Sequence, residues 1–402
     1  MQYETSSMRQ GILNGLRVLD FTWMLAGPFG TRVLADFGAE VIKVQSAKTA
    51  KGAESNLTGY FNTWNRNKRS MTLDMNTPEA KEIILRLTEI CDVVVENFSP
   101  RVMSNWGLGY EKLKKVRPDL IMVSISAMGQ TGPWKDMVGY GPTLQALSGL
   151  TYLTSFHKDS PLGLGFAYAD PMIGLYAALA VLAALEYRDR TGQGQYIDLS
   201  GYEVSCSLIG PTLMDVASNK KAAIPRGNDS DTFSAAPYGC YRCSGEDRWC
   251  VIAVSNEQEW KVLCKVLGNP GWTKEEKFSM LSKRKQNAEE LDRAISQWTV
   301  MHTPEEAVQM LREEGVPAGV VQNAEEVARD PQLQARDFFI TLDHPALGQT
   351  ISDRSPIRFK DSSQDDWRAA PLLGEDNRYI YMELLGFTEE GFSSYLERKI
   401  IR

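Results

Sequence analysis

The first half of the chain alternates short apolar runs with stretches of helical periodicity. Apolar runs at Arg17–Thr22, Glu40–Val44, Asp92–Glu96 and Asp119–Ser126 predict buried strands, and the first helix is expected over Phe29–Gly38. Strands that are apolar throughout and alternate with helices are typical of a parallel sheet covered on both faces. The pattern therefore predicts an α/β fold, in which ligands collect at the carboxyl ends of the strands.

The pattern changes near Ala217, and the second half is organised differently. Ser218–Pro237 is rich in polar residues, alanine and proline, which favours a linker. Gly239–Val254 predicts a β-hairpin, Glu257–Glu314 is mainly helical in pattern, and Gly315–Val321 predicts a short strand. The alternation of the first half does not continue here, so we expect a second, smaller domain in the middle of the chain.

The composition is that of a globular protein with a small excess of negative charge. The 402 residues include 44 Lys and Arg against 51 Asp and Glu, a net charge of −7. This balance argues against nucleic acid or an anionic membrane surface as the main partner. Six cysteines are too few for a disulfide scaffold. Met1–Gln10 lacks the apolar core of a secretory signal, and the apolar run Met172–Leu185 is too short to span a bilayer, so we expect a cytoplasmic protein.

Asp170 is the residue that most strongly indicates chemistry. It stands directly before Pro171 and a long apolar helix, which predicts Asp170 as the N-cap and proline at the first helical position. Most aspartates in this position only cap a helix. The positive end of the helix also favours the ionised carboxylate, however, so Asp170 would remain a nucleophile at neutral pH.

Other candidate motifs carry weaker signals. Arg66, Lys68 and Arg69 form a basic cluster that fits either a solvated edge or a clamp for phosphates. The chain has neither a GxGxxG motif after the first strand nor a GxxxxGK[ST] loop. Cys240 and Cys243 have no second paired motif, so no metal site is expected.

Several motifs together resemble the class III, formyl-CoA transferase-like CoA-transferases. They span nearly the whole chain in the family's order: Val18-Leu-Asp-Phe-Thr22, Ala26-Gly-Pro28, Leu34-Ala-Asp-Phe-Gly-Ala-Glu-Val-Ile-Lys-Val44, Asn67-Lys-Arg-Ser70, Val94-Val-Glu-Asn-Phe98, Gly129-Gln-Thr-Gly-Pro133, Ala169-Asp170, Thr191-Gly-Gln-Gly-Gln195 and Pro371-Leu-Leu-Gly-Glu375. No single motif is specific, but the ordered set is.

The resemblance implies a particular architecture. It implies a large Rossmann-like domain with a CoA-binding first part at residues 1–217, a linker and smaller α+β domain at 218–330, and a return to the large domain at 331–402. It further implies a ring-like chain interlocked with a second chain, in a homodimer or in a heteromer with a related chain.

The resemblance also implies the chemistry. The family nucleophile is an aspartate at the start of the apolar helix, which matches Asp170. It attacks a donor thioester to give an aspartyl mixed anhydride, and returning CoA thiolate gives an aspartyl-CoA thioester. The expected partners are an acyl-CoA and a carboxylic acid; CoA thioesters are substrates, and no tightly bound cofactor is implied.

The matching motifs imply a set of CoA contacts. These are Leu25, Ala26, Leu73, Met75, Asn76, Asn97, Phe98, Arg101, Asn105 and Tyr140, the last within the segment Val138–Gly141. Asn105 stands where relatives carry an arginine, so the phosphates are expected at Arg101 or at the basic cluster Arg66–Arg69. Trp23, Met24 and Leu25 are expected to line the substrate pocket; Leu25 replaces a polar residue, which favours a bulky or aromatic acid, with succinyl-CoA as an expected donor.

Two alternatives stay open at this stage. The first is an acyl-CoA racemase of the same fold, which would need a histidine base where this chain has Val138-Gly-Tyr140. Tyrosine is a poor base at neutral pH, which favours transfer over racemisation. The second is one subunit of a heteromeric transferase; the retained Asp170 argues against a purely structural role.

Overall fold

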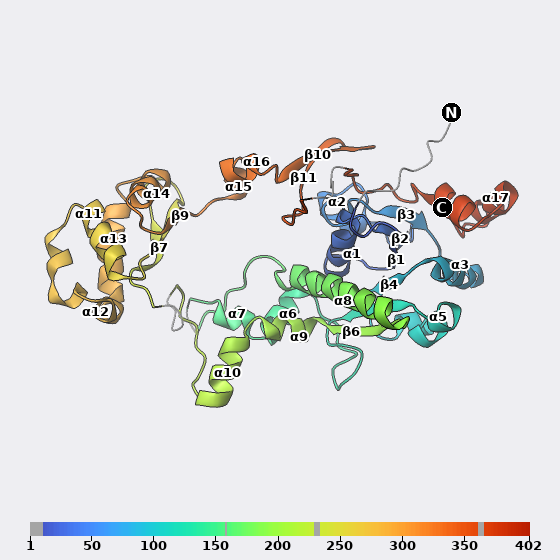
Figure 1. The fold of residues 1–402 in the computed structure, drawn as a ribbon, viewed down its shortest axis with the longest axis horizontal. Helices are drawn as coiled ribbons and strands as arrows, with labels where there is room; N and C mark the ends of the chain where they lie inside the picture. The colour runs from blue at the N-terminus through green and yellow to red at the C-terminus, as the bar shows by residue number, and fades with distance from the viewer. Residues whose placement is uncertain (1–10, 157–158, 229–233, 361–365) are drawn as a thin grey trace. The chain divides into compact units, whose positions relative to one another are not determined.

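The computed structural model describes residues 11–156, 159–228, 234–360 and 366–402 (Figure 1). Met1–Gln10, where no secretory signal is expected, lies outside the described residues. The chain divides into two compact units, which are described separately. The large unit comprises Met1–Tyr152, Gly163–Ala223 and Gln334–Arg402, and the small unit comprises Leu153–Leu162 and Ile224–Leu333.

The large unit is built on a six-stranded parallel sheet with the strand order β3-β2-β1-β4-β5-β6. The strands are β1 Arg17–Asp20, β2 Glu40–Gln45, β3 Arg69–Thr72, β4 Val93–Glu96, β5 Ile121–Ser126 and β6 Tyr196–Ser200. This order is that of a Rossmann-like, doubly wound sheet. The predicted α/β fold with a parallel sheet is confirmed.

Both faces of this sheet are buried, which explains why the strands are apolar throughout. Successive side chains of a strand point to opposite faces. In β1, Val18 packs into the core on one face while Leu19 packs into the core on the other; Ile121 and Met122 of β5 divide in the same way.

Helices cover each face of the sheet. One core contains residues of α1 Ala26–Asp36 and α8 Ala169–Thr191. The other contains residues of α3 Pro78–Ile90 and α5 Tyr110–Val116, and is closed by the C-terminal part of the chain through Tyr381 and Phe392. Residues near the C-terminus therefore complete the core to which Leu19 of β1 belongs.

The helices α1 and α8 pack closely because glycines face each other. A Cβ added at Gly30 would lie 2.7 Å from the carbonyl oxygen of Gly174, and one at Gly174 would lie 2.6 Å from that of Ala26. A larger residue at either position would push the helices apart. Asp170 lies one turn before Gly174, so this contact brings the start of α8 to the start of α1.

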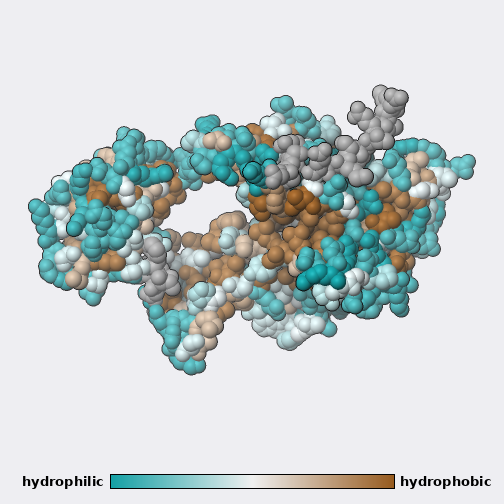
Figure 2. Space-filling model, viewed as in Figure 1, coloured by the Kyte–Doolittle hydropathy of each residue, from teal (hydrophilic) through white to brown (hydrophobic). Residues whose placement is uncertain are grey.

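The outer face of α8 is apolar and exposed. Leu175, Leu179 and Leu182 are 43%, 63% and 39% exposed, whereas Ala177 and Val181 on the inner face are buried. Figure 2 shows apolar surface over the first half of α8 that gives way to hydrophilic surface toward its end. Among the described residues α8 is the one helix long and apolar enough to cross a membrane, but a core helix that is buried on one side passes the same test.

Shorter elements complete the large unit and border it. They are η1 Gly52–Glu54, α2 Gly59–Asn65, α4 Val102–Asn105, α6 Gly141–Leu147, α7 Leu150–Leu153, α9 Gly201–Ser207, α10 Gly210–Asn219, α16 Pro331–Ala335, the antiparallel hairpin β10 Phe339–His344 and β11 Gly348–Asp353, η4 Tyr379–Leu384 and α17 Glu389–Glu397.

The small unit has an α+β core of its own. Its antiparallel sheet has the order β7-β8-β9, so the hairpin expected at Gly239–Val254 is present. The helices α11, α13 and α14 pack against the sheet around Tyr241, Ile252 and Leu263. Its elements are β7 Tyr238–Arg242, β8 Trp249–Ala253, α11 Glu257–Val266, η2 Gly271–Lys274, η3 Glu276–Phe278, α12 Leu281–Gln286, α13 Ala288–Thr299, α14 Pro304–Glu313, β9 Ala318–Val320 and α15 Ala324–Ala328.

Candidate active site

A cavity of about 440 Å³ opens at the carboxyl edge of the parallel sheet. The strand order reverses between β1 and β4, and the loops that follow these two strands both contribute to the wall. Open α/β sheets bind ligands at such a reversal. The lining residues are Trp23, Met24, Leu25, Ala26, Tyr60, Asn97, Phe98, Ser99, Pro100, Val102, Ile125, Ser126, Ala127, Lys135, Met137, Val138, Gly139, Tyr140, Gly141, Pro142, Leu144, Ala167, Asp170 and Ile173.

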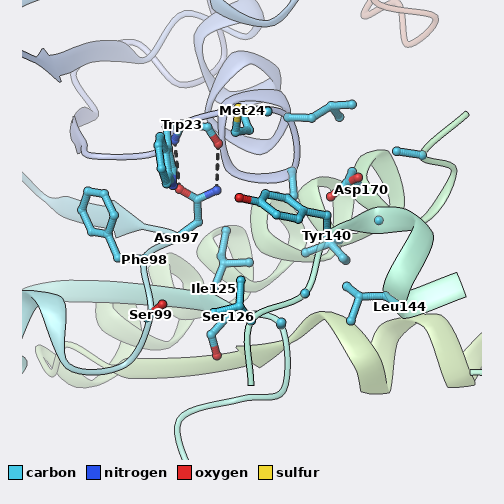
Figure 3. A pocket seen from close by; sticks show the side chains of 18 of the residues that line it. Trp23, Met24, Asn97, Phe98, Ser99, Ile125, Ser126, Tyr140, Leu144 and Asp170 are labelled. Atoms are coloured by element: carbon cyan, nitrogen blue, oxygen red, sulfur yellow. Dashed lines mark hydrogen bonds between the residues drawn. The ribbon is translucent and has the colours of Figure 1, made fainter. Parts of the chain in front are cut away.

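The loops after β1 and β4 are joined by a two-way hydrogen bond. The backbone N–H of Trp23 donates to Oδ1 of Asn97 at 2.9 Å, and Nδ2 of Asn97 donates to the carbonyl oxygen of Trp23 at 2.9 Å (Figure 3). The rings of Trp23 and Phe98 lie beside this pair with centroids 6.4 Å apart. One side of the cavity is therefore a rigid, aromatic wall.

Asp170 lies on the other side, and Tyr140 extends between it and Asn97 (Figure 3). The prediction that Asp170 is the N-cap of α8 is wrong. Tyr168, with φ −58° and ψ −33°, already has helical backbone angles, so α8 begins at Ala169 and Asp170 is its second residue. The helix starts earlier because the preceding backbone is already turned, and the N–H of Asp170 donates to the carbonyl oxygen of Ala167.

A glycine makes room for this carboxylate. A Cβ at Gly141, the first residue of α6, would lie well inside van der Waals contact with Oδ2 of Asp170. Any side chain at this position would compete with the carboxylate for space. The resemblance placed Gly141 among the CoA contacts, but its contact with Asp170, a residue far along the chain, could not be predicted from the sequence.

Burial sets the charge state of Asp170. It raises the pKa of Asp170 to about 6, so the expected preference of the helix end for the ionised form is outweighed. At pH 7 about nine in ten carboxylates are still ionised. Within the described residues nothing donates a hydrogen bond to this carboxylate, so it is a poorly solvated and reactive anion.

Two further groups show that this edge of the sheet is weakly solvated. Burial, followed by the negative charges of Asp170 and Glu54, raises the pKa of Tyr60, a cavity residue on α2. Burial also raises the pKa of Glu96, at the end of β4, to about 7. The Glu96 carboxyl accepts a hydrogen bond from the N–H of Phe98 at 2.8 Å and so supports the loop that carries Asn97 and Phe98.

The basic cluster is neither a solvated edge nor a phosphate clamp. Arg66 and Lys68 are fully buried. Nη2 of Arg66 lies 2.7 Å from Asp36, and Nζ of Lys68 lies 3.0 Å from Asp20. A buried charge needs a partner, and each of these cations already has an acidic one. Arg69 likewise pairs with Glu40 and Asp376.

The expected CoA contacts fall into two groups. Leu25, Ala26, Asn97, Phe98 and Tyr140 line the cavity, as do Trp23 and Met24 of the expected substrate pocket. Leu73, Met75 and Asn76 do not line it. They follow β3 at the far edge of the sheet, where Leu73 is buried in the core, Met75 packs on it and Asn76 donates to Asp74. Contact of these three with CoA stays a prediction.

The cations near the cavity are exposed. Lys135 lines the cavity, and it is a residue that sequence reasoning missed because it lies just outside the Gly129–Pro133 motif of its loop. Arg101 lies between the lining residues Pro100 and Val102, with Nε 3.5 Å from the carboxylate of Asp136. Asn105 ends α4, is exposed and does not line the cavity.

Thiols and metal ligands are not gathered at the site. Among the described residues no group of three or more His, Cys, Asp and Glu side chains is placed to hold a metal ion. Cys240, Cys243, Cys250 and Cys264 are free, and burial raises the pKa of each thiol. Thiols with raised pKa values are poor metal ligands and poor nucleophiles at neutral pH.

Residues 13–377 match the pattern of CoA-transferase family III. The chain belongs to this family. It is 33% identical over 397 residues to the succinyl-CoA–D-citramalate CoA-transferase of Chloroflexus aurantiacus, which covers 97% of this chain and 98% of the relative. It is 32% identical to the formyl-CoA:oxalate CoA-transferase of Bradyrhizobium diazoefficiens, covering 94% of each chain.

A solved structure agrees with this assignment. A CAIB/BAIF family protein from Brucella suis superposes with a TM-score of 0.85 at 33% identity, covering 94% of this chain and all of that one. This family III CoA-transferase is therefore an enzyme that uses CoA thioesters as substrates. The match confirms the resemblance drawn from the ordered motifs.

Proposed function

We propose that this enzyme moves CoA from an acyl-CoA donor to a carboxylic acid through covalent derivatives of Asp170. The observation that carries the proposal is the placement of a half-buried, weakly solvated carboxylate in the cavity at the strand-order reversal. An anion that has lost most of its hydration is a stronger nucleophile than one in water.

The transfer is a sequence of anion exchanges. An oxygen of Asp170 attacks the donor carbonyl, the C–S bond breaks, and CoA thiolate leaves a mixed anhydride. The thiolate then attacks the Asp170 carbonyl, the C–O bond to the donor breaks, and an aspartyl-CoA thioester forms. An acceptor carboxylate repeats both steps in reverse, which restores Asp170. Each step replaces one anion by another, so no proton moves, and among the described residues no histidine lines the cavity.

Asp170→Asn tests this proposal. Asparagine is nearly isosteric but cannot form the anhydride, so transfer should fall by roughly 1000-fold or more while CoA still binds. Wild-type enzyme incubated with acyl-CoA and then hydroxylamine should be modified at residue 170. Asp189→Asn, an exposed carboxylate at the other end of α8, is the matched control and should stay active.

Three outcomes contradict the proposal. They are a fully active Asp170→Asn enzyme, hydroxylamine labelling at another carboxylate, and exchange of the α-proton of an acyl-CoA in deuterium oxide without CoA transfer. The last outcome identifies a racemase. Activity of the chain purified alone separates a complete enzyme from a subunit of a heteromer.

We propose a bulky or aromatic acceptor acid, with succinyl-CoA as donor. The aromatic wall of Trp23 and Phe98, together with Met24, supports an apolar acceptor. The name of the Chloroflexus relative includes succinyl-CoA, which supports the donor. We further propose that Lys135 and Arg101 face the CoA phosphates, since both are exposed cations at this edge.

The acceptor is tested with a panel of small and aromatic acids. Trp23→Ala removes an apolar wall and should reduce kcat/KM for aromatic acids relative to small ones by about tenfold or more. Trp134→Ala is a matched control, because Trp134 is exposed and does not line the cavity. An unchanged preference in Trp23→Ala would contradict the proposed acceptor class.

We propose that a second chain covers the exposed face of α8, in a dimer in which the two chains interlock. The apolar surface of Leu175, Leu179 and Leu182 supports this, because soluble proteins rarely leave a continuous apolar face uncovered. A cytoplasmic location is proposed with it; the free thiols among the described residues fit a reducing compartment.

A further inference from the structure

The turn between β1 and α1 is held by side chains from two distant segments. Asn97 binds both the N–H and the carbonyl oxygen of Trp23. The N–H of Met24 donates to Oε1 of Glu54 at 2.6 Å. Glu54 is 30 residues away along the chain and does not itself line the cavity. The backbone of the cavity wall is thus fixed at two successive residues, Trp23 and Met24.

Met24 has a backbone conformation that needs such support. Its φ is +64°, in the left-handed region that methionine rarely adopts. Met24 lies outside regular secondary structure. Helix α1 begins only at Ala26, and the side chain of Leu25, the residue between the two, caps no N–H of the helix. The Glu54 carboxylate is therefore the group that compensates for the unfavourable conformation.

Glu54 is itself firmly placed. It ends the short helix η1, and the next residues are anchored in the large unit. The buried Asn56 donates to Gln45 at 3.2 Å and to the carbonyl oxygen of Pro371 at 2.7 Å. Thr58 caps α2, the helix that carries the cavity residue Tyr60. A carboxylate on an anchored segment can hold a loop at little entropic cost.

We propose that Glu54 is a positioning residue of the active site: its carboxylate holds Met24 in the left-handed conformation and so fixes the wall formed by Trp23, Met24 and Leu25. Glu54 acts as a hydrogen-bond acceptor and not as a charge or a base. The anion exchanges of the proposed function move no proton, so they need no base at this position. The activity part of this inference rests on the proposed function, and the binding part rests on the predicted contact of CoA with Leu25 and Ala26.

Two substitutions at Glu54 separate the acceptor role from a charge role. Glu54→Gln keeps an oxygen that accepts the Met24 N–H, so the affinity for free CoA and kcat/KM should stay within about threefold of the wild type. Glu54→Ala leaves that N–H without its partner and should weaken CoA binding and kcat/KM by about ten- to hundredfold. Thermal unfolding of both variants verifies that they are folded.

A double substitution tests the link to Met24. Glycine adopts the left-handed region without cost, so Met24→Gly should make the enzyme much less sensitive to the loss of Glu54. Adding Glu54→Ala to Met24→Gly should then change CoA affinity by less than about threefold. Gly59 lies between Glu54 and Tyr60 in the sequence, and a Cβ added there would meet open space. Gly59→Ala is therefore a control for substitutions in this segment.

Calorimetric titration of free CoA is the main readout, because it is independent of Asp170 chemistry. If Asp170→Asn stayed active, the proposed function would fail while the Glu54 result stood. The inference is overturned if Glu54→Gln is as damaging as Glu54→Ala, if Glu54→Ala binds CoA and turns over like the wild type, or if Met24→Gly gives no rescue.

Discussion

At the residue scale, the site depends on one carboxylate kept in an unfavourable environment. Asp170 is largely buried, faces apolar and aromatic side chains, and presses against the backbone at Gly141. Its pKa of about 6 means that folding raises its affinity for a proton. Reactivity and stability therefore oppose each other at this position.

The raised pKa predicts how stability depends on pH. The folded protein binds the Asp170 proton more tightly than the unfolded chain does, so ionised Asp170 lowers the free energy of unfolding above pH 6. This destabilisation disappears as the pH falls from about 6 to below 3.8. At pH 7.5 the cost is at most about 3 kcal/mol. Asp170→Asn should therefore unfold at a higher temperature than the wild type at pH 7.5, with a difference that shrinks toward pH 4.

Calorimetric unfolding scans from pH 4 to pH 8 measure this difference. Asp189→Asn, at the exposed end of α8, should show no comparable gain. An Asp170→Asn enzyme that is less stable than the wild type at pH 7.5 would show that the carboxylate has a stabilising partner.

At the element scale, the crossing of α1 and α8 determines where the nucleophile lies. The contact at Gly30 and Gly174 leaves no room for side chains, so the helix backbones touch. Asp170 and the start of α1 reach the same cavity only because the two helices approach this closely. The crossing links packing in the core to the geometry of the site.

Gly174→Val tests this link. The added side chain meets backbone atoms that cannot move aside, so we expect a loss of about 1–3 kcal/mol in the free energy of unfolding, as for other overpacked cores. Transfer activity should fall further than stability alone explains, because Asp170 lies one turn away. Denaturant unfolding and kcat together measure the two effects.

Gly271→Ala is the matched control. Gly271 begins η2 in the small unit and has open space where its Cβ would lie. That variant should keep both its stability and its kcat. A Gly174→Val enzyme with normal kcat would show that the position of Asp170 does not depend on the helix crossing.

At the scale of the whole molecule, the outer face of α8 is a large apolar surface that is exposed to solvent in the single chain (Figure 2). Its inner face packs on α1 and the sheet, whereas its outer leucines meet solvent. Burial of this face by a second chain would supply the hydrophobic stabilisation that a single chain forgoes.

Leu179→Glu tests whether a second chain covers this face. Leu179 is 63% exposed, so a charge is tolerated in the single chain but is costly inside an interface. We expect the wild type to sediment as a dimer and Leu179→Glu as a monomer or an aggregate. Leu396→Glu, at a leucine of α17 that is 40% exposed, should remain a dimer. A wild-type monomer, or recovery of the protein only with membranes, would contradict the proposed partner.

The sequence by itself determined the parallel α/β fold, four of the six strands of its sheet and the family, whereas the edge strands β3 and β6 were not predicted. Apolar runs and helical periodicity are local patterns. The apolar run at Val18 and Leu19 correctly predicted a buried strand, because both faces of the sheet are covered. Asp170 was found because it stands at a recognisable helix start, although burial gave it a raised pKa that the local pattern did not indicate.

Only the tertiary structure decided which residues share the site. The sequence indicated that Arg66 and Lys68 form a basic cluster on a solvated edge or in a phosphate clamp. In the structure both are buried, and each is paired with an acidic residue elsewhere in the chain. Glu54 and Tyr60 belong to the site although nothing in their neighbourhood in the sequence marks them. The physical reason is that burial and charge pairing depend on contacts between distant segments, and the topology of the sheet sets those contacts.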